Sequence, residues 1–156
     1  MRFDLRILPD GRMELDAYAV CERTRKSGPV TFLVDTGASI SSLGETDIRS
    51  LGLESRDLER YLGKPIVGIG GRSRTLLVRD VVTILASESG EEILPNHDFV
   101  FHKGTRSKKR RRSGVQAYER VDIFRAPSIL GTDLLKKFGL ILYYDPTRRV
   151  AYVEKR

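Results

Sequence analysis

The feature that most constrains the fold of this chain is an alternation of apolar and polar residues with a period of two. The alternation runs through residues 3–7 and again through residues 13–21, with Pro9-Asp10-Gly11-Arg12 between the two runs. A period of two matches a strand with one buried face, whereas an amphipathic helix repeats every 3.6 residues. The first 21 residues therefore predict a β-hairpin whose turn contains the proline, aspartate and glycine.

The remainder of the chain predicts further short strands separated by short helices. Strands are expected at residues 30–34, 65–69, 75–85, 93–101, 128–131, 140–144 and 150–153. Helical spacing of apolar residues is confined to short segments, at residues 45–51, 54–62 and 132–138. Ser27-Gly28-Pro29 predicts a break before the strand at 30–34, and the strands 65–69 and 75–85 predict a long hairpin. The fold class is therefore mainly β, and the sequence shows no internal repeat.

The size and composition fit a single compact domain. The chain has 156 residues, of which 40% are hydrophobic and 31% charged, and it has no apolar run long enough to span a bilayer. The amino-terminal residues carry charge and lack the apolar centre of a signal peptide. We therefore expect one domain over residues 1–156, no membrane partner and a cytoplasmic location.

Cysteine and histidine are too scarce to predict a disulfide or a metal site. Cys21 is the only cysteine, which excludes an intramolecular disulfide and a zinc cage built on cysteines. Its alternation with apolar neighbours indicates a small buried residue. His97 and His102 are the only histidines, and they have no companion cysteines. We expect no metal and no cofactor.

The net charge of +7 comes from one short segment. Residues 103–112 carry seven Lys and Arg residues and no acidic residue. Removing these seven from the 28 basic residues leaves 21, the same number as the acidic residues, so the rest of the chain is neutral. A neutral body argues against a fold whose whole surface binds nucleic acid.

The basic segment, Lys103–Arg112, has three interpretations. It contains no apolar residue to bury, which favours a solvated, disordered insertion at about residues 102–118. Alternatively, its arginines contact nucleic acid or an acidic partner, since arginine binds phosphates and releases counterions. The third interpretation is a cleavage-prone loop or a localisation signal. No aromatic residue lies within the segment, so base stacking is not supported.

The chemistry is carried by a short motif at the end of an apolar strand. Residues 30–34 lead directly into Asp35-Thr36-Gly37-Ala38-Ser39. This places one carboxylate at a tight turn, where Gly37 allows close approach and the Thr36 hydroxyl can bond a neighbouring main chain. Two further motifs accompany it, Gly68-Ile69-Gly70-Gly71 and the segment Ile129–Leu135, in which an apolar strand runs into a helix.

The Asp-Thr-Gly motif occurs only once in the sequence, at Asp35. One carboxylate alone activates water poorly, whereas two carboxylates in contact share a proton and divide the roles of base and acid. A functional pair therefore requires two copies of the chain related by a two-fold axis, with Asp35 of each copy meeting at that axis.

These motifs resemble those of the retropepsin-like aspartic proteases, the single-domain homodimeric class that includes retroviral proteases and their cellular relatives. The matching segments are FLVDTGAS at 32–39, GIGG at 68–71 and ILGTDLLKKFGL at 129–140. The resemblance implies a closed β-barrel of the acid-protease type. It also implies an aspartic endopeptidase that acts as a homodimer on peptide or protein substrates.

The resemblance further implies a role for individual residues. Asp35 is the expected catalytic residue, and Thr36 and Gly37 are expected to support the active-site loop. The expected substrate contacts are Ala38, Ser39, Gly68, Ile69, Gly70 and Gly71, the last four forming the tip of a flap. Leu130 and Gly131 are expected to pack behind the active-site loop. Asp133 is left outside the predicted site, because a carboxylate at the start of a short helix interacts favourably with the helix dipole.

Two positions depart from the retroviral pattern. In retroviral members an acid shortly after the motif pairs with an arginine after the late glycine, and the corresponding residues here are Ser39 and Thr132. Losing both partners together leaves no unpaired charge. The chain therefore resembles cellular or prokaryotic members more closely than viral ones.

A second function class stays open at this point. The chain could be a protease-like dimerisation or binding module without activity, with the basic segment contacting nucleic acid or acidic partners. The intact Asp35-Thr36-Gly37 motif favours the enzyme.

Overall fold

The computed structural model describes residues 1–61, 67–68, 71–72, 74–103 and 126–155. The strands are β1 (Arg2–Asp4), β2 (Arg6–Ile7), β3 (Met13–Cys21), β4 (Lys26–Val34), β5 (Ser42–Leu43), β6 (Glu59–Arg60), β7 (Val67–Gly68), β8 (Gly71–Arg72), β9 (Arg74–Ser87), β10 (Gly90–Lys103), β11 (Ser128–Leu130), β12 (Leu140–Asp145) and β13 (Val150–Lys155). The helical elements are α1 (Glu45–Ser50), the 3-10 turn η1 (Ser55–Asp57) and α2 (Thr132–Lys137). No helix among the described residues has the length and apolar character needed to cross a membrane.

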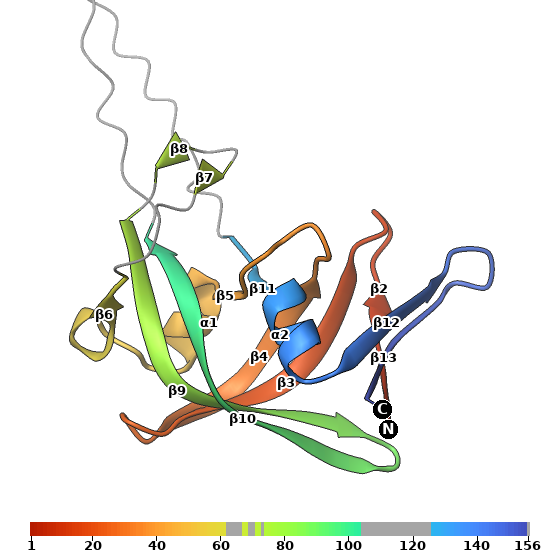
Figure 1. Cartoon of the computed structure of the whole chain (residues 1–156), viewed down its shortest axis with the longest axis horizontal. Coiled ribbons are helices and arrows are strands. Elements are labelled where there is room, and N and C mark those ends of the chain that lie inside the picture. Colours follow the sequence, from red (N-terminus) through yellow and green to blue (C-terminus); the bar gives the residue numbers. More distant parts are fainter. Residues whose placement is uncertain (62–66, 69–70, 73, 104–125, 156) are drawn as a thin grey trace, which may run out of the picture.

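Six strands close into a barrel, which confirms the predicted mainly β, closed-barrel fold. Their order is β3-β4-β11-β5-β10-β9, and β9 pairs in turn with β3 to complete the ring (Figure 1). The short strands β2 and β6 add to its wall at β3 and β9. A closed ring leaves no exposed strand edge in its wall, so the barrel is a stable frame for the loops at its end.

The barrel has an internal two-fold arrangement that the sequence does not reveal. The hairpin β3–β4 is followed by β5 and α1, and the hairpin β9–β10 is followed by β11 and α2. The strands then cross over, because β11 pairs with β4 and β5 pairs with β10, both in parallel. Between these pairs β5 and β11 are antiparallel, with Ser42 opposite Ile129. Each half of the chain thus completes the wall of the other half.

The core lies inside the barrel and follows the same arrangement. Phe32 of β4 and Phe99 of β10 are fully buried, and their rings stack with centroids 5.4 Å apart. Cys21 is buried at the end of β3, as expected from its alternation with apolar residues. Aliphatic side chains from both hairpins surround the phenylalanines, so the apolar faces of the strands meet in a single cluster.

The two chain ends form a separate three-stranded sheet in the order β1-β13-β12. Phe3 of β1 lies opposite Val153 of β13, and both side chains are buried. The Met1 amino group donates to the Lys155 carbonyl at 3.0 Å, so the two ends lie side by side (Figure 1). The predicted C-terminal hairpin is confirmed, with strands 140–145 and 150–155.

This sheet also corrects the predicted N-terminal hairpin. β1 pairs with β13, and only Arg6 and Ile7 pair with the strand that begins at Met13. Alternation shows that a segment is a strand but not which strand it pairs with. The burial of Phe3 against Val153, 150 residues away, decides the pairing here.

Two further predictions are wrong. Ser27-Gly28-Pro29 does not break the chain, because these residues lie within β4 opposite β3, and the turn is at residues 22–25. The segment 75–85 is part of β9, whose hairpin partner is β10, and β7 instead pairs with β8. Gly28 and Pro29 predicted a turn, but the pairing of β3 with β4 continues through them.

The remaining helix and strand predictions fall close to the observed elements. The segments at 45–51 and 132–138 form α1 and α2, and the strands at 93–101 and 128–131 lie within or along β10 and β11. The segment at 54–62 forms η1 and then β6 rather than one helix. Most of the predicted insertion at about 102–118 lies within residues 104–125, which are outside the described residues, so it stays a prediction.

Candidate active site

Asp35 lies where β4 leaves the barrel wall. Its backbone N–H donates to the Leu130 carbonyl at 3.1 Å, which continues the parallel pairing of β4 with β11 by one residue. The Asp35 side chain is partly buried, and Thr36 and Gly37 after it are exposed. The barrel therefore presents the carboxylate at its end, on a segment whose position is fixed up to Asp35.

A tight turn over residues 35–38 holds the Asp35 carboxylate in place. Asp35 Oδ1 accepts a hydrogen bond from Gly37 N at 2.8 Å, and Ala38 N donates to the Asp35 carbonyl at 3.2 Å. A Cβ added to Gly37 would lie 3.1 Å from Asp35 Oδ1, tighter than ordinary contact. Glycine is thus favoured at position 37 because the carboxylate folds back onto its N–H.

The far end of this loop is attached to α2 through Ser41 and Asp133. Asp133 Oδ1 accepts from Ser41 Oγ at 2.6 Å, and Asp133 Oδ2 accepts from Ser41 N at 3.0 Å. Ser41 Oγ also accepts from Gly131 N at 2.8 Å, and Ser41 is completely buried. A buried hydroxyl with both a donor and an acceptor partner is fully satisfied, which makes this cluster a firm attachment.

The middle of the loop is held by Thr132. The Ala38 carbonyl accepts from Thr132 N at 2.9 Å and from Thr132 Oγ1 at 3.2 Å. Gly131 lies directly against this part of the loop, since a Cβ there would meet the Ala38 carbonyl at 2.9 Å. Thr132 therefore attaches the loop by uncharged hydrogen bonds, at the position where the retroviral pattern has an arginine. Ser39, at the position of the retroviral acid, is exposed.

The second half of the barrel repeats the serine–aspartate cluster. Ser128 Oγ accepts from Gly44 N at 2.8 Å and donates to Asp47 Oδ2 at 2.5 Å. Burial raises the pKa of Asp47, and the hydrogen bond from Ser128 partly opposes that rise. The two-fold arrangement of the fold thus extends to its hydrogen bonds: each helix follows a glycine, and its aspartate holds a serine from the other half.

The predicted flap residues are only partly within the described residues. Gly68 and Gly71 lie opposite each other in the antiparallel β7–β8 pair. Ile69 and Gly70 lie outside the described residues. The flap thus stays a prediction, carried by this pairing and by the glycine-rich sequence.

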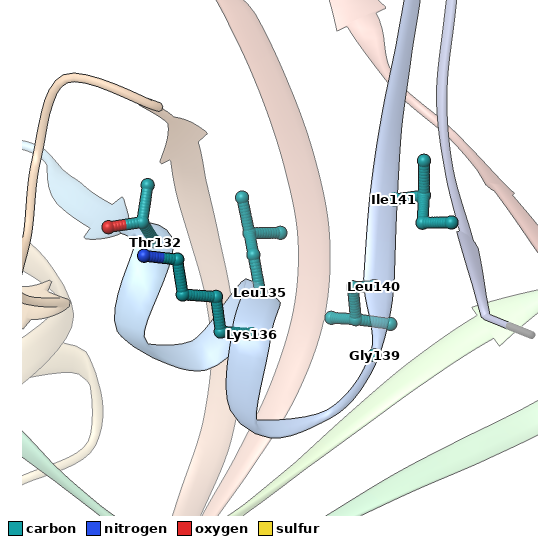
Figure 2. Close-up of a pocket in the computed structure, with 6 residues that line it drawn as sticks. All are labelled: Thr132, Leu135, Lys136, Gly139, Leu140 and Ile141. Carbon is teal, nitrogen blue, oxygen red and sulfur yellow. The ribbon is translucent and has the colours of Figure 1, made fainter.

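A shallow pocket of about 470 Å³ lies beside the loop attachment. α2 forms one side, with Thr132, Leu135 and Lys136, and the start of β12 forms the other (Figure 2). Asp35 is not among the lining residues. The pocket is therefore formed by α2 and the start of β12, without the Asp35 carboxylate.

The predicted site residues Asp35 to Ser39 lie together on one loop, and Leu130 and Gly131 pack behind it as expected. Sequence reasoning missed Ser41 and assigned Asp133 only to its helix. The two residues are 92 positions apart, so no local pattern links them. The available signal was the place of Asp133 two residues after the glycine of the third motif.

No group of three or more His, Cys, Asp or Glu residues suited to a metal ion occurs in the part of the chain that the structure describes. His97 is buried and pairs through Nε2 with Thr83 Oγ1 at 3.0 Å. Its ring contacts Phe99 and Phe138 edge-on. Such surroundings describe a core histidine rather than a metal ligand.

Comparisons with known proteins agree with this geometry. A model of the aspartyl protease family matches residues 24–112, more than half of the chain, and includes the Asp35 loop. The solved structure of a retropepsin-like aspartic protease from Rickettsia conorii is similar, with a TM-score of 0.55 and 16% identity over 98% of this chain and 89% of that one. No curated protein sequence matches this chain.

The family match contains the Asp35 motif, and the structural likeness extends over nearly the whole barrel and the terminal sheet. The chain belongs to the aspartyl protease family and is an aspartic-type endopeptidase with a retropepsin-like fold.

Proposed function

We propose that Asp35 is the catalytic aspartate and that the active enzyme is a homodimer in which two Asp35 carboxylates meet at a two-fold axis. The observation that carries the proposal is the single Asp-Thr-Gly motif directly after β4, with Asp35 partly buried and Thr36 and Gly37 exposed. Aspartic protease chemistry needs two carboxylates, one as base and one as acid, and each copy of this chain offers one such loop.

In this proposal the two carboxylates share a proton and hold a water molecule between them. The ionised carboxylate removes a proton from the water as its oxygen attacks the peptide carbonyl carbon. The protonated carboxylate donates to the carbonyl oxygen, and a proton then passes to the leaving nitrogen as the C–N bond breaks. Gly37 N donates to Asp35 Oδ1 and so orients the carboxylate for this role.

The substrate would be an extended peptide bound between the loop and a flap of each copy. Ala38 and Ser39 follow the catalytic residue and would contact the peptide main chain, as would Gly68, Ile69, Gly70 and Gly71 from above. Strand-like binding of this kind uses main-chain hydrogen bonds, so it accepts many side chains. The reaction requires no metal and no cofactor.

The test is the isosteric variant Asp35→Asn, with Asp16→Asn on the exposed face of β3 as the matched control. Hydrolysis of denatured casein and of a mixed peptide library is measured between pH 3 and 7. Asp35→Asn should lower the rate by about 1000-fold or more, because the acid–base pair is lost, and Asp16→Asn should leave it unchanged. An Asp35→Asn variant that retains wild-type activity would falsify the assignment.

The two-fold arrangement has its own test, a mixed dimer of one wild-type and one Asp35→Asn copy isolated through two affinity tags. A shared site predicts that the mixed dimer is as inactive as the Asp35→Asn homodimer. Half of the wild-type activity in the mixed dimer would mean that each copy has a complete site, and the homodimer proposal would then be wrong.

A further inference from the structure

We propose that Asp133, acting through Ser41, is a positioning residue that sets the place of the catalytic loop, and that this role is distinct from its contribution to stability. The inference rests on the proposed function, in which Asp35 is the catalytic aspartate. It concerns a residue outside the Asp-Thr-Gly motif that touches neither the substrate nor Asp35.

The Asp133 carboxylate holds Ser41 by both of its oxygens. Oδ2 accepts from Ser41 N at 3.0 Å and Oδ1 accepts from Ser41 Oγ at 2.6 Å. The same hydroxyl accepts from Gly131 N at 2.8 Å, so three hydrogen bonds converge on one residue. Because Ser41 is fully buried, water cannot replace a bond that is lost there.

The effect reaches Asp35 through a short and firmly held loop. Ala38 is bonded to Thr132 by 2.9 Å and 3.2 Å contacts, and Asp35 N is bonded to Leu130 at 3.1 Å. Together with Ser41, these contacts fix the loop at its start, middle and end against residues 130–133. Without the bonds to Ser41, one of the three attachments is lost. The Asp35 loop can then change its position relative to residues 130–133.

Catalysis is more sensitive to such a shift than folding is. In the proposed dimer the same displacement occurs in both copies, so the separation of the two carboxylates changes twice over. A displacement of about 1 Å in a catalytic group can cost about 100-fold in rate. Stability also falls, because the buried partners of Ser41 lose their bonds, but that loss changes the folded fraction and not the rate of a folded site.

The molecule contains a matched control for this distinction. Ser128 and Asp47 form the same hydroxyl–carboxylate pair beside Gly44, and Ser128 is 1% exposed whereas Ser41 is 0% exposed. This second pair joins α1 to the start of β11 and makes no bond to residues 35–38. Variants of this pair therefore measure how much stability and activity are lost when a buried hydroxyl–carboxylate pair is removed at a place that is not attached to the Asp35 loop.

The experiment compares Ser41→Ala and Asp133→Ala with Ser128→Ala and Asp47→Ala in the full chain. The probe is a quenched fluorescent peptide taken from a cleavage site in denatured casein. Active sites are titrated with a statine-containing peptide inhibitor, and kcat is expressed per titrated site at a temperature well below the lowest Tm. This normalisation removes any loss caused by unfolded protein.

We expect kcat per site to fall by about 10- to 100-fold in Ser41→Ala and Asp133→Ala, with KM nearly unchanged. The double variant should be no worse than either single variant, and Ser41→Thr should recover most of the rate. Ser128→Ala and Asp47→Ala should lower Tm by a similar amount but leave kcat per site close to wild type.

The proposal is overturned if Ser41→Ala and Asp133→Ala lower Tm and leave kcat per site unchanged, or if the Ser128 and Asp47 variants lose as much kcat. Asp35→Asn is assayed alongside. If Asp35→Asn is inactive while Ser41→Ala and Asp133→Ala keep the wild-type kcat, only the positioning role fails. If Asp35→Asn is active, the proposed function itself fails.

Discussion

The two serine–aspartate clusters use the same chemistry in two different places. In each, a buried serine hydroxyl accepts from the N–H of a glycine and donates to the aspartate of the helix that follows the glycine. The cluster of Ser41 and Asp133 also holds the Ser41 N–H, and neighbouring Thr132 bonds Ala38 in the loop that carries Asp35. The cluster of Ser128 and Asp47 holds the start of β11 instead.

The comparison teaches that hydrogen-bond chemistry alone does not identify a functional residue. Both clusters close the barrel in the same way. In each, the residues at the start of one helix are bonded to a serine in the other half of the chain, next to the parallel strand pairs. Only the cluster on the α2 side lies next to the turn that carries Asp35. If Asp35 is the catalytic residue as proposed, the contribution of each cluster to catalysis depends on whether it is attached to the Asp35 loop.

The largest effect should come from adding a methyl group at the two glycines. A Cβ at Gly44 would lie 2.2 Å from the Ala126 carbonyl oxygen, whereas a Cβ at Gly131 would lie 2.9 Å from the Ala38 carbonyl oxygen. Backbone atoms cannot rotate away, so Gly44→Ala should cost more than about 3 kcal/mol, above the usual range for overpacking. Gly131→Ala should cost less stability. The free energy of unfolding is measured by urea denaturation.

The same pair of variants also separates the two clusters by activity. Gly131→Ala pushes on the loop at Ala38 and should lower kcat per titrated site, while any folded fraction of Gly44→Ala should keep it. Gly139→Ala, at a positive φ of 63° with open space around the added methyl, controls for backbone effects alone. Equal losses of stability in Gly44→Ala and Gly131→Ala would contradict the steric argument.

Acid should change the stability in opposite directions through His97, which packs beside α2, and through Asp47 on α1. His97, 4% exposed, contacts Phe138 at the end of α2, and Lys137, Asp98 and Asp133 are the charged groups that face it. Burial lowers the pKa of His97 to about 4, from 6.5. Between these values the unfolded chain binds a proton that the folded chain does not. The free energy of unfolding should therefore fall by about 3 kcal/mol as the pH drops from 6.5 to 4.

For Asp47 on α1, the change in the free energy of unfolding with acid has the opposite sign. Burial raises the pKa of Asp47, so the folded chain binds the proton more readily than the unfolded chain does, and acid relieves a cost there. Urea denaturation at pH 4.5 and 7.5 should show the His97 effect in the wild type and in His102→Gln. The part of the pH dependence that comes from His97 should be lost in His97→Phe. A pH dependence in His97→Phe equal to that of the wild type would refute a neutral His97 in the folded chain.

Local sequence signals predicted most of the elements and the motif of the site. Alternation located the strands, and the apolar strand before Asp35 placed the carboxylate at the end of β4. Residues 128–140 gave a strand, a helix and a glycine stop, all close to their observed bounds. These features are set within about ten residues, where propensity and pattern act.

The pairing of the elements was not predictable in the same way. Phe3 pairs with Val153, and Ser41 is held by Asp133, and each of these contacts joins segments that local patterns cannot relate. The two-fold arrangement was missed for the same reason, since the two halves share geometry rather than sequence. Asp133 was read as a helix-start residue because its partner lies 92 residues away. The β9–β10 hairpin is local, but it was missed because the glycines at 68–71 were assigned as the tip of a hairpin with residues 75–85.

The smallest effect on the fold should come from the chain that follows β10. The basic segment follows Lys103, the last residue of β10, and carries most of its charge at residues 106–112. The sequence gives this segment no apolar residue with which to join the core. Replacing its six basic residues from Arg106 to Arg112 with serine should therefore change the free energy of unfolding by less than about 0.5 kcal/mol.

The same variant should keep kcat per titrated site but lose any affinity for polyanions. Binding of a single-stranded RNA 20-mer is measured between 50 and 300 mM salt, with the wild type and a variant of six exposed Lys and Arg residues elsewhere as controls. If the segment binds phosphates, its slope of log affinity against log salt should shrink by about 0.7 for each contact removed. A fall in kcat per site would show instead that the basic segment affects the active site.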